Sequence, residues 1–157
     1  MGLDIRAYRG LKKIENPLLD EDGYPENDNE WTPGVGMEFS EEYFPGRGEG
    51  LESNAVYAWE DTFYFSAGSY SGYNWWRDKL EDFSDGDSFV ELINFADNEG
   101  VIGPIVSKKL YNDFIKNHYR AIIYSETLED GDYWLKKYKE WEKAFEMASD
   151  NGAVDFY

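Results

Sequence analysis

Six side chains that can bind a ligand lie within nine consecutive positions of the chain. They are two hydroxyls, two phenols, an amide and a guanidinium: Ser69, Tyr70, Ser71, Tyr73, Asn74 and Arg77. Hydroxyl and amide groups both donate and accept hydrogen bonds, tyrosine rings stack on flat groups, and a guanidinium binds anions through two parallel hydrogen bonds. We therefore expect a ligand pocket around residues 68–74, with Arg77 on its rim.

The elements expected to position this stretch are two strands, a loop and a helix. Residues 56–59 and 62–65 are β-branched and aromatic, with two acids between them, which indicates a tight hairpin. Two glycines within residues 68–72 favour a loop after the second strand. A strand followed by a loop and a helix start points free backbone N–H groups at one spot.

The helix after this loop is predicted from Asn74, a good N-cap, to Phe83. Trp76, Leu80 and Phe83 fall at helical spacing and form one apolar stripe. The alternative interpretation is a well-capped helix start with nothing bound to it. In that case Arg77 only pairs with an acid on its own helix.

The opposite wall of the expected pocket has three candidate residues. Asp97 and Glu99 lie in a polar turn that follows an apolar segment, and Ser107 follows the apolar residues 101–106. Ser107 is also a natural cap for a helix running through Leu110 and Phe114. The candidate ligand-binding set is thus Ser69, Tyr70, Ser71, Tyr73, Asn74, Arg77, Asp97, Glu99 and Ser107.

The remaining patterns predict an α+β fold in a single domain over residues 1–157. Strands are expected at residues 3–8, where apolar and polar side chains alternate, and at residues 35–39. Residues 88–95 fit either a helix or a strand, and a capping-box pattern from Ser88 favours the helix. A long amphipathic helix follows Asp132. We expect a small, mainly antiparallel sheet from the N-terminal half, packed against three to four helices. Residues 153–157 are expected to form either a strand that closes this sheet or a docked tail.

Residues 16–34 are expected to form a mobile acidic loop. The stretch contains turn-forming Asn-Pro, Asp-Gly and Tyr-Pro pairs and is dense in acids from Asp20 to Glu30. It is not an EF-hand, because Pro25 stands where that calcium loop needs glycine. No metal site is predicted here.

Charge is the most unbalanced property of the chain. The sequence has 33 acidic and 15 basic residues, a net charge of −18. Residues 1–50 hold 12 acids and 5 bases, residues 51–100 hold 11 and 2, and the remainder holds 10 and 8. Such a surface repels nucleic acid and anionic membranes, and it either attracts basic partners or only keeps the protein soluble.

Catalytic and metal-binding motifs are missing from the sequence. It has no cysteine, its one histidine is His118, and it has no nucleophile-elbow, P-loop or zinc-protease motif. Carboxylates are so abundant that no pair stands out as an acid and a base. We expect no catalytic residue and no cofactor. The sequence also lacks a long apolar run and a signal-peptide pattern, from which we expect a cytoplasmic protein without a membrane span.

Four sequence blocks form a recognisable pattern. They are MGLDI at the start, AGSYSGYN followed by Trp-Arg, GPIVS followed by Lys-Leu, and the last helix followed by GAVDF. Together they resemble a family of small uncharacterised phage and prophage proteins. That family has no established activity, so the resemblance implies a phage origin and the cytosol of a host bacterium. The acidic residues 20–30 are not part of the resemblance.

These observations lead to two functional hypotheses in the setting of phage–host conflict. The first is a non-catalytic protein that binds a small, nucleotide-like ligand in the pocket at residues 68–74, with Arg77 and either Lys108 or Lys109 offsetting the negative field. The alternative is an acidic protein that blocks a basic host protein or mimics nucleic acid. The second hypothesis needs acids ordered on one face rather than a pocket. The oligomeric state stays open.

Overall fold

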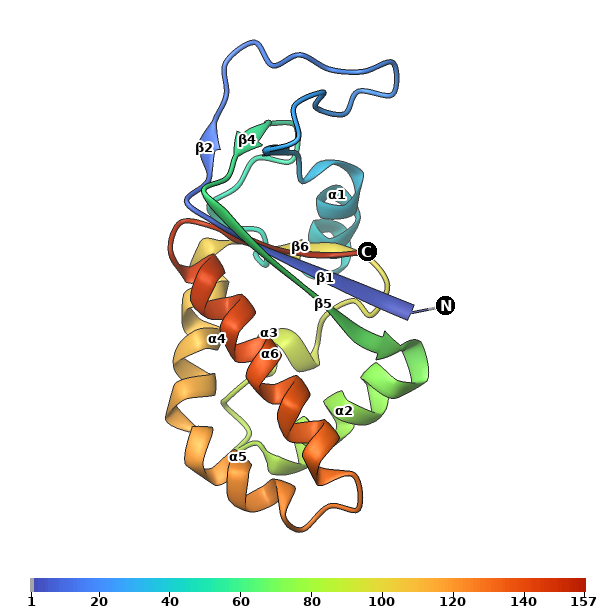
Figure 1. Ribbon diagram of the computed structural model, residues 1–157, viewed down its shortest axis with the longest axis vertical. Helices are drawn as coiled ribbons and strands as arrows, with labels where there is room; N and C mark the ends of the chain where they lie inside the picture. Colours follow the sequence, from blue (N-terminus) through green and yellow to red (C-terminus); the bar gives the residue numbers. More distant parts are fainter. Residues whose placement is uncertain (1) are drawn as a thin grey trace.

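The computed structural model describes residues 2–157 and confirms an α+β fold. A central sheet has most of the helices on one side and a smaller sheet with α1 on the other (Figure 1). In chain order the elements are β1 (Gly2–Arg9), β2 (Lys12–Lys13), β3 (Glu30–Trp31), α1 (Gly34–Tyr43), β4 (Tyr57–Ala58), β5 (Asp61–Ser69), α2 (Tyr70–Phe83), α3 (Val90–Ile93), β6 (Gly100–Ile102), α4 (Pro104–Lys116), α5 (His118–Ser125), α6 (Gly131–Ser149) and β7 (Ala153–Phe156).

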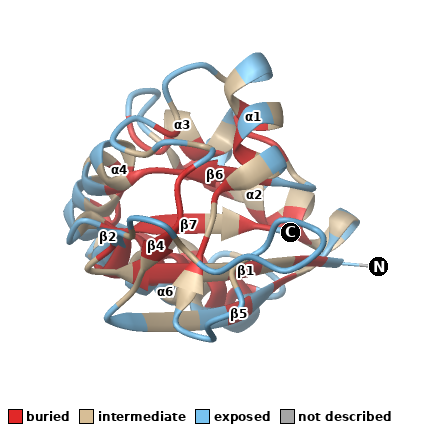
Figure 2. Cartoon of the chain, turned by 90° about the horizontal axis from the view of Figure 1, so that it is seen from above, coloured by how far each residue is buried: buried red, intermediate tan, exposed pale blue. Residues whose placement is uncertain are grey.

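The central sheet is antiparallel throughout and has the strand order β5-β1-β7-β6. Leu3, Ile5 and Ala7 are fully buried on one face of β1, as their alternation predicts. The C-terminal strand β7 does join the sheet, but it lies between β1 and β6 and the sheet stays open. Only two of the four strands come from the N-terminal half. Figure 2 shows the buried residues in red concentrated in these strands and the elements packed on them.

The longest helix, α6, covers one face of this sheet with an aromatic stripe. Its buried large side chains recur every three or four residues, which is the spacing of one helix face. Lys137 on this helix is also buried, and its Nζ donates to the carbonyl of Ser66 at 2.7 Å. The aromatic members of the stripe are Trp134, Tyr138, Trp141 and Phe145.

The predicted hairpin of residues 56–59 and 62–65 is wrong. β4 pairs with β2 and β3 in a second, three-stranded sheet, whereas β5 pairs with β1. The cause is that the two strands serve different apolar clusters. Phe65 packs in the main core beneath the helices, while Tyr57 packs with Tyr8 and Trp31 on the other side of the central sheet.

The predicted strand at residues 35–39 is also wrong, since these residues belong to α1. Met37 and Ser40 are its buried residues, and Phe44 just beyond its end packs on the core. Val35 and Tyr43 are strongly exposed on the opposite side. Apolar side chains every four residues indicate a helix, and residues 35–39 alone are too few to show that spacing.

The structure has six helices rather than three or four. The helix expected to begin at Ser107 begins at Pro104 and breaks at Asn117 into α4 and α5. The helical interpretation of residues 88–95 is confirmed for α3, but Ser88 is not its cap. Phe89 holds the cap position with a left-handed φ of 67°, and buried Ser88 is bonded to Asp85 instead.

The acidic segment between β2 and β3 projects from the end of the molecule opposite α5 (Figure 1). Most of its side chains are exposed. A bridge pairs Leu19 with Pro25, and the carboxylate of Asp20 accepts from the backbone N–H groups of Asp22 and Tyr24. The segment is thus a loop with a local turn at its tip. Its mobility stays a prediction.

Candidate functional site

The expected loop at residues 68–72 does not exist as a loop. β5 runs through Ser69, and α2 begins at the next residue. Ser69, not Asn74, is the N-cap: its Oγ accepts from the N–H of Gly72 at 3.0 Å and lies 3.3 Å from the Oγ of Ser71. Both serines are therefore engaged at the helix start, which is the well-capped alternative considered from the sequence.

Tyr73 and Tyr70 face the core rather than a pocket. Tyr73 is fully buried, its ring lies 5.7 Å from that of Trp141, and burial raises the pKa of its phenol. Tyr70 is half-buried against the same core. The Tyr73 ring offers no free face for stacking on a ligand, and Tyr70 packs on the core with part of its surface, so both contribute to the fold.

Asn74, Arg77 and Asp97 do come together. Asn74 Nδ2 donates to Asp97 Oδ2 at 3.0 Å, and Asn74 Oδ1 accepts from Arg77 Nη2 at 2.7 Å. Arg77 also donates from Nη1 to the carbonyl of Phe95 at 2.6 Å, and its guanidinium lies 5.0 Å from the centroid of the Tyr73 ring. α2 and the segment after α3 are therefore joined by a charge-assisted network.

This network borders a surface hollow with a volume of about 420 Å³, called here the aromatic hollow. Its aromatic residues include Phe44 and Phe95, whose ring centroids are 5.3 Å apart. Arg77 and Asp97 are its two members from the predicted set. The full lining is Phe39, Tyr43, Phe44, Arg77, Phe95, Ala96, Asp97 and Asn98. The aromatic residues of α1 escaped the sequence analysis because α1 was read as a strand.

The two remaining candidates lie apart from this network. Ser107 is fully buried inside α4, where its N–H donates to the carbonyl of Gly103, and its hydroxyl has no partner within residues 2–157. It neither caps a helix nor lines a wall. Glu99 is exposed on the rim of a second hollow of about 460 Å³, called here the carboxyl hollow. That hollow is lined by Tyr24, Thr32, Pro33, Gly34, Val35, Gly36, Glu99, Asp155, Phe156 and Tyr157.

Asp155 is the titratable group of the carboxyl hollow that the sequence did not single out. It lies on β7 beside Arg6 of β1, and its Oδ2 accepts from Trp31 Nε1 at 3.1 Å. Burial raises its pKa to about 7, while the hydrogen bond from Trp31 and the charge of Arg6 lower it. A closing strand was one of two expectations for residues 153–157, but the sequence did not indicate that Trp31 would donate a hydrogen bond to this carboxyl.

The aromatic and carboxyl hollows are separate, but both are lined by residues of α1 and by residues from 95–99; the surface along which the two hollows lie is called here the α1 groove. Residues from both ends of α1 make one wall. Residues 95–99 and the end of β7 make the other. Val35, Phe39 and Tyr43 are spaced every four residues along this helix, so they present one apolar stripe along the groove.

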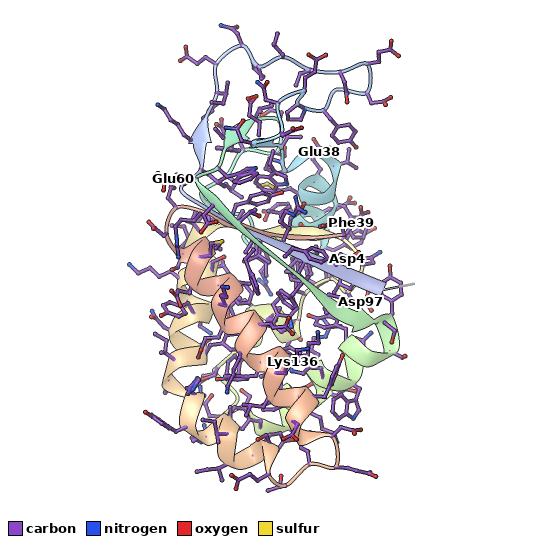
Figure 3. The ribbon with its side chains drawn as sticks, viewed as in Figure 1. Asp4, Glu38, Phe39, Glu60, Asp97 and Lys136 are labelled. Atoms are coloured by element: carbon purple, nitrogen blue, oxygen red, sulfur yellow. The ribbon has the colours of Figure 1, made fainter. Side chains whose placement is uncertain are left out.

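The charge around the α1 groove is negative. Asp97, Glu99 and Asp155 line it, and Glu38 and Glu42 are exposed beside the apolar stripe of α1. Figure 3 shows Glu38 and Phe39 on α1 and Asp97 across from them on the same side of the molecule. The one basic residue among the described lining residues is Arg77, whose guanidinium is already bonded to two partners. The groove therefore favours an occupant that is partly apolar and positively charged.

Within residues 2–157, no group of three or more acidic or histidine side chains could hold a metal ion. No helix formed by these residues has both the length and the apolar character needed to cross a membrane. His118 is half-buried, and its Nδ1 lies 2.9 Å from Oε1 of Glu142.

Comparisons with protein-family models, with curated proteins and with solved structures find no match to this chain. The resemblance to phage and prophage proteins therefore depends on the sequence blocks alone.

Proposed function

We propose that this protein is a non-catalytic binding protein that captures a short basic segment of another protein in the α1 groove. The observation that carries the proposal is the apolar stripe of Val35, Phe39 and Tyr43 facing residues 95–99 across a groove with acidic edges. An exposed apolar strip edged by charges of one sign is a common form of protein recognition surface. The net charge of −18 strengthens attraction of a basic partner at long range.

The groove has the length of a short extended peptide. α1 has 10 residues. At a rise of about 1.5 Å per residue it is roughly 15 Å long. An extended chain advances about 3.3 Å per residue, so the groove spans about five residues of a partner. Because alternate side chains of an extended segment point the same way, we expect two or three to enter the groove and the others to face solvent or the acidic edges.

A protein segment fits this surface better than a nucleic-acid mimic would. A mimic of the phosphate backbone needs regularly spaced charge and has no use for an apolar floor. If the resemblance to phage proteins reflects common descent, the partner is a host protein and binding blocks its basic surface. The negative charge opposes direct binding of nucleic acid.

The test uses the purified protein and a five-residue basic peptide, acetyl-Lys-Leu-Lys-Phe-Arg-amide. We expect binding by calorimetry, amide shifts confined to α1 and residues 95–99 in NMR spectra, and weaker binding as salt concentration rises. Two control peptides carry Glu at the basic positions or Ser at the apolar ones, and neither should bind.

Two matched variants test whether peptide binding depends on the α1 groove or on another part of the surface. Phe39→Ala combined with Tyr43→Ala should weaken binding by about ten-fold or more, since large aromatic side chains dominate such interfaces. Tyr119→Ala, at a position on α5 that is 80% exposed, should leave it unchanged. Equal affinity in the groove variant and wild type, or peptide shifts outside the groove, would reject the proposal.

A second candidate function is favoured by the network of Arg77, Asn74 and Asp97 beside the aromatic hollow. Here a small ligand with a flat ring would stack on aromatic residues of the hollow and bond to Asp97 and to the remaining N–H groups of Arg77. This keeps the small-ligand hypothesis but moves its site from residues 68–74 to the hollow. A neutral nucleoside suits it better than a nucleotide, because Arg77 is the one cation lining the hollow and is already bonded.

Native mass spectrometry of the purified protein tests this candidate directly, together with titration of nucleosides against the matching nucleotides. A bound molecule that is lost in Asp97→Asn but kept in Glu99→Gln would support it. If no small molecule co-purifies and no nucleoside shifts the Phe95 or Asp97 amide signals, the candidate fails.

A further inference from the structure

Asp155 has an unusual position for a carboxyl group. It lies inside a sheet, yet no lysine or arginine of residues 2–157 forms a tight ion pair with it. It lies in the interior of the central sheet, between Arg6 on β1 and Val101 on β6. Its side chain is on the side of the sheet that faces the second sheet, where Trp31 donates to Oδ2. No hydrogen bond to Oδ1 is found within the described chain, and Asp155 is one of the residues that line the carboxyl hollow.

Resting on the proposed function, we infer that Asp155 is the specificity-determining acceptor for one lysine or arginine side chain of the bound segment. That side chain enters the carboxyl hollow between the start of α1 and the end of β7. Its cationic head meets Oδ1 of Asp155, with Glu99 at the rim as a second carboxylate. Its aliphatic stem packs along Val35 and Phe156.

The alternative occupant of this hollow is an anion, because the first turn of α1 also borders it. A helix start carries the equivalent of about half a positive charge. Asp155 and Glu99 together supply up to two negative charges in the same hollow. No lysine or arginine is among the lining residues, although Arg6, directly opposite Asp155 on β1, points to the same face of the sheet and offsets one of these negative charges. The balance therefore favours a cation.

Binding at Asp155 is coupled to a proton. Burial raises the pKa of Asp155 to about 7, so near neutral pH a substantial fraction of the carboxyl is protonated. A cation stabilises the ionised form, and its binding releases the proton to solvent. The other titratable or charged groups facing Asp155 are Arg6 from β1, Glu99 before β6, Tyr8 from β1 and Tyr157 after β7. Trp31 from β3 contributes a hydrogen bond, and the first turn of α1 has no acid.

Calorimetry of the basic peptide at pH 6 and pH 8.5, in buffers of different ionisation enthalpy, tests this inference. With a carboxyl that titrates near neutral pH, affinity should rise by up to about ten-fold across this range, with proton release at the lower pH. Asp155→Asn retains an acceptor for Trp31 and should abolish the pH dependence. Glu126→Gln makes the same charge change at an exposed position beyond α5 and should retain it.

Peptides in which norleucine replaces each basic residue in turn identify the side chain involved. One such replacement should weaken binding to wild type but not to Asp155→Asn. Titration of the Asp155 side-chain carbon signal by NMR gives a direct second measurement, and its midpoint should drop when the peptide is present. If the peptide binds in the groove without proton release and with an unchanged midpoint, the inference is wrong while the proposed function stands. If no basic peptide binds at any pH, both are wrong.

Discussion

The indole N–H of Trp31 donates to the Oδ2 atom of Asp155 at 3.1 Å, although the two residues are 124 positions apart. Trp31 belongs to the small sheet and Asp155 to the central sheet. This contact joins the two sheets beside the start of α1, where the carboxyl hollow opens. A carboxyl buried in this way links the protonation state of the protein to its folding and to the groove.

Stability should depend on pH through Asp155. The pKa of this carboxyl is raised from 3.8 to about 7, so between these values the folded state holds a proton that the unfolded state has released. The free energy of unfolding contributed by Asp155 is therefore highest below pH 4, falls as pH rises to about 7, and is constant above that. Urea unfolding of wild type and Asp155→Asn at pH 5 to 8 isolates this contribution, because the other acids are common to both.

We expect the free energy of unfolding of Asp155→Asn, relative to that of wild type, to increase as the pH rises through that window. Trp31→Phe removes the hydrogen bond that favours the ionised form, and should extend the window to higher pH. A constant difference from pH 5 to 8 would mean that the carboxyl is already ionised throughout.

Trp141→Ala should destabilise the fold by about 3–5 kcal/mol, because it leaves a large cavity in the main core. Trp141 is fully buried on α6, and its ring lies 5.1 Å from Phe65 and 5.5 Å from Phe156 on two strands of the sheet. Chemical denaturation measures the loss, with Tyr119→Ala as an exposed aromatic control. Wild-type stability in Trp141→Ala would contradict the packing of α6 on the sheet.

Arg77→Ala should cost about 1.5–3 kcal/mol, the range for hydrogen bonds that involve a charged group. The substitution leaves Asn74 and the carbonyl of Phe95 without a donor from Arg77. Arg77→Lys should recover only part of the loss, because an ammonium cannot reach both acceptors with the fixed fork of a guanidinium. Thermal unfolding of the three proteins gives the ranking, and equal midpoints would show that the network contributes nothing to stability.

The acidic loop should be dispensable for folding. Leu19 and Pro25 are bridged, so Asn-Gly can replace residues 20–24 without moving the flanking chain. We expect a change of only a few degrees in melting temperature, because loop shortening at an exposed site has a small effect. The NMR spectrum of the rest of the chain should be preserved. A large fall in melting temperature would show that the loop packs on the body of the protein.

Local patterns in the sequence were sufficient to predict the elements that are long or whose apolar residues recur at a regular spacing. The alternation of Leu3, Ile5 and Ala7 predicted the first strand, and the stripe containing Tyr138, Trp141 and Phe145 predicted the last helix. In both cases one face of the element is buried, and the spacing of the apolar residues indicates which face that is. The α+β class followed from these elements, but the position of β7 between β1 and β6 did not, since residues 153–157 were expected to close the sheet or to dock as a tail.

Tertiary packing decided the elements with short or mixed patterns and the composition of the site. Whether β4 and β5 formed a hairpin depended on which of two apolar clusters each strand could join, and residues 56–65 do not encode that choice locally. Ser69 and Tyr73 carry the same chemical groups whether they line a pocket or serve as a cap and a core residue. Asp155 lines the α1 groove with a raised pKa because the assembled structure partly buries it, while Trp31, 124 positions away, donates a hydrogen bond that lowers this pKa. Burial is a property of the assembled structure, so no local pattern could reveal it.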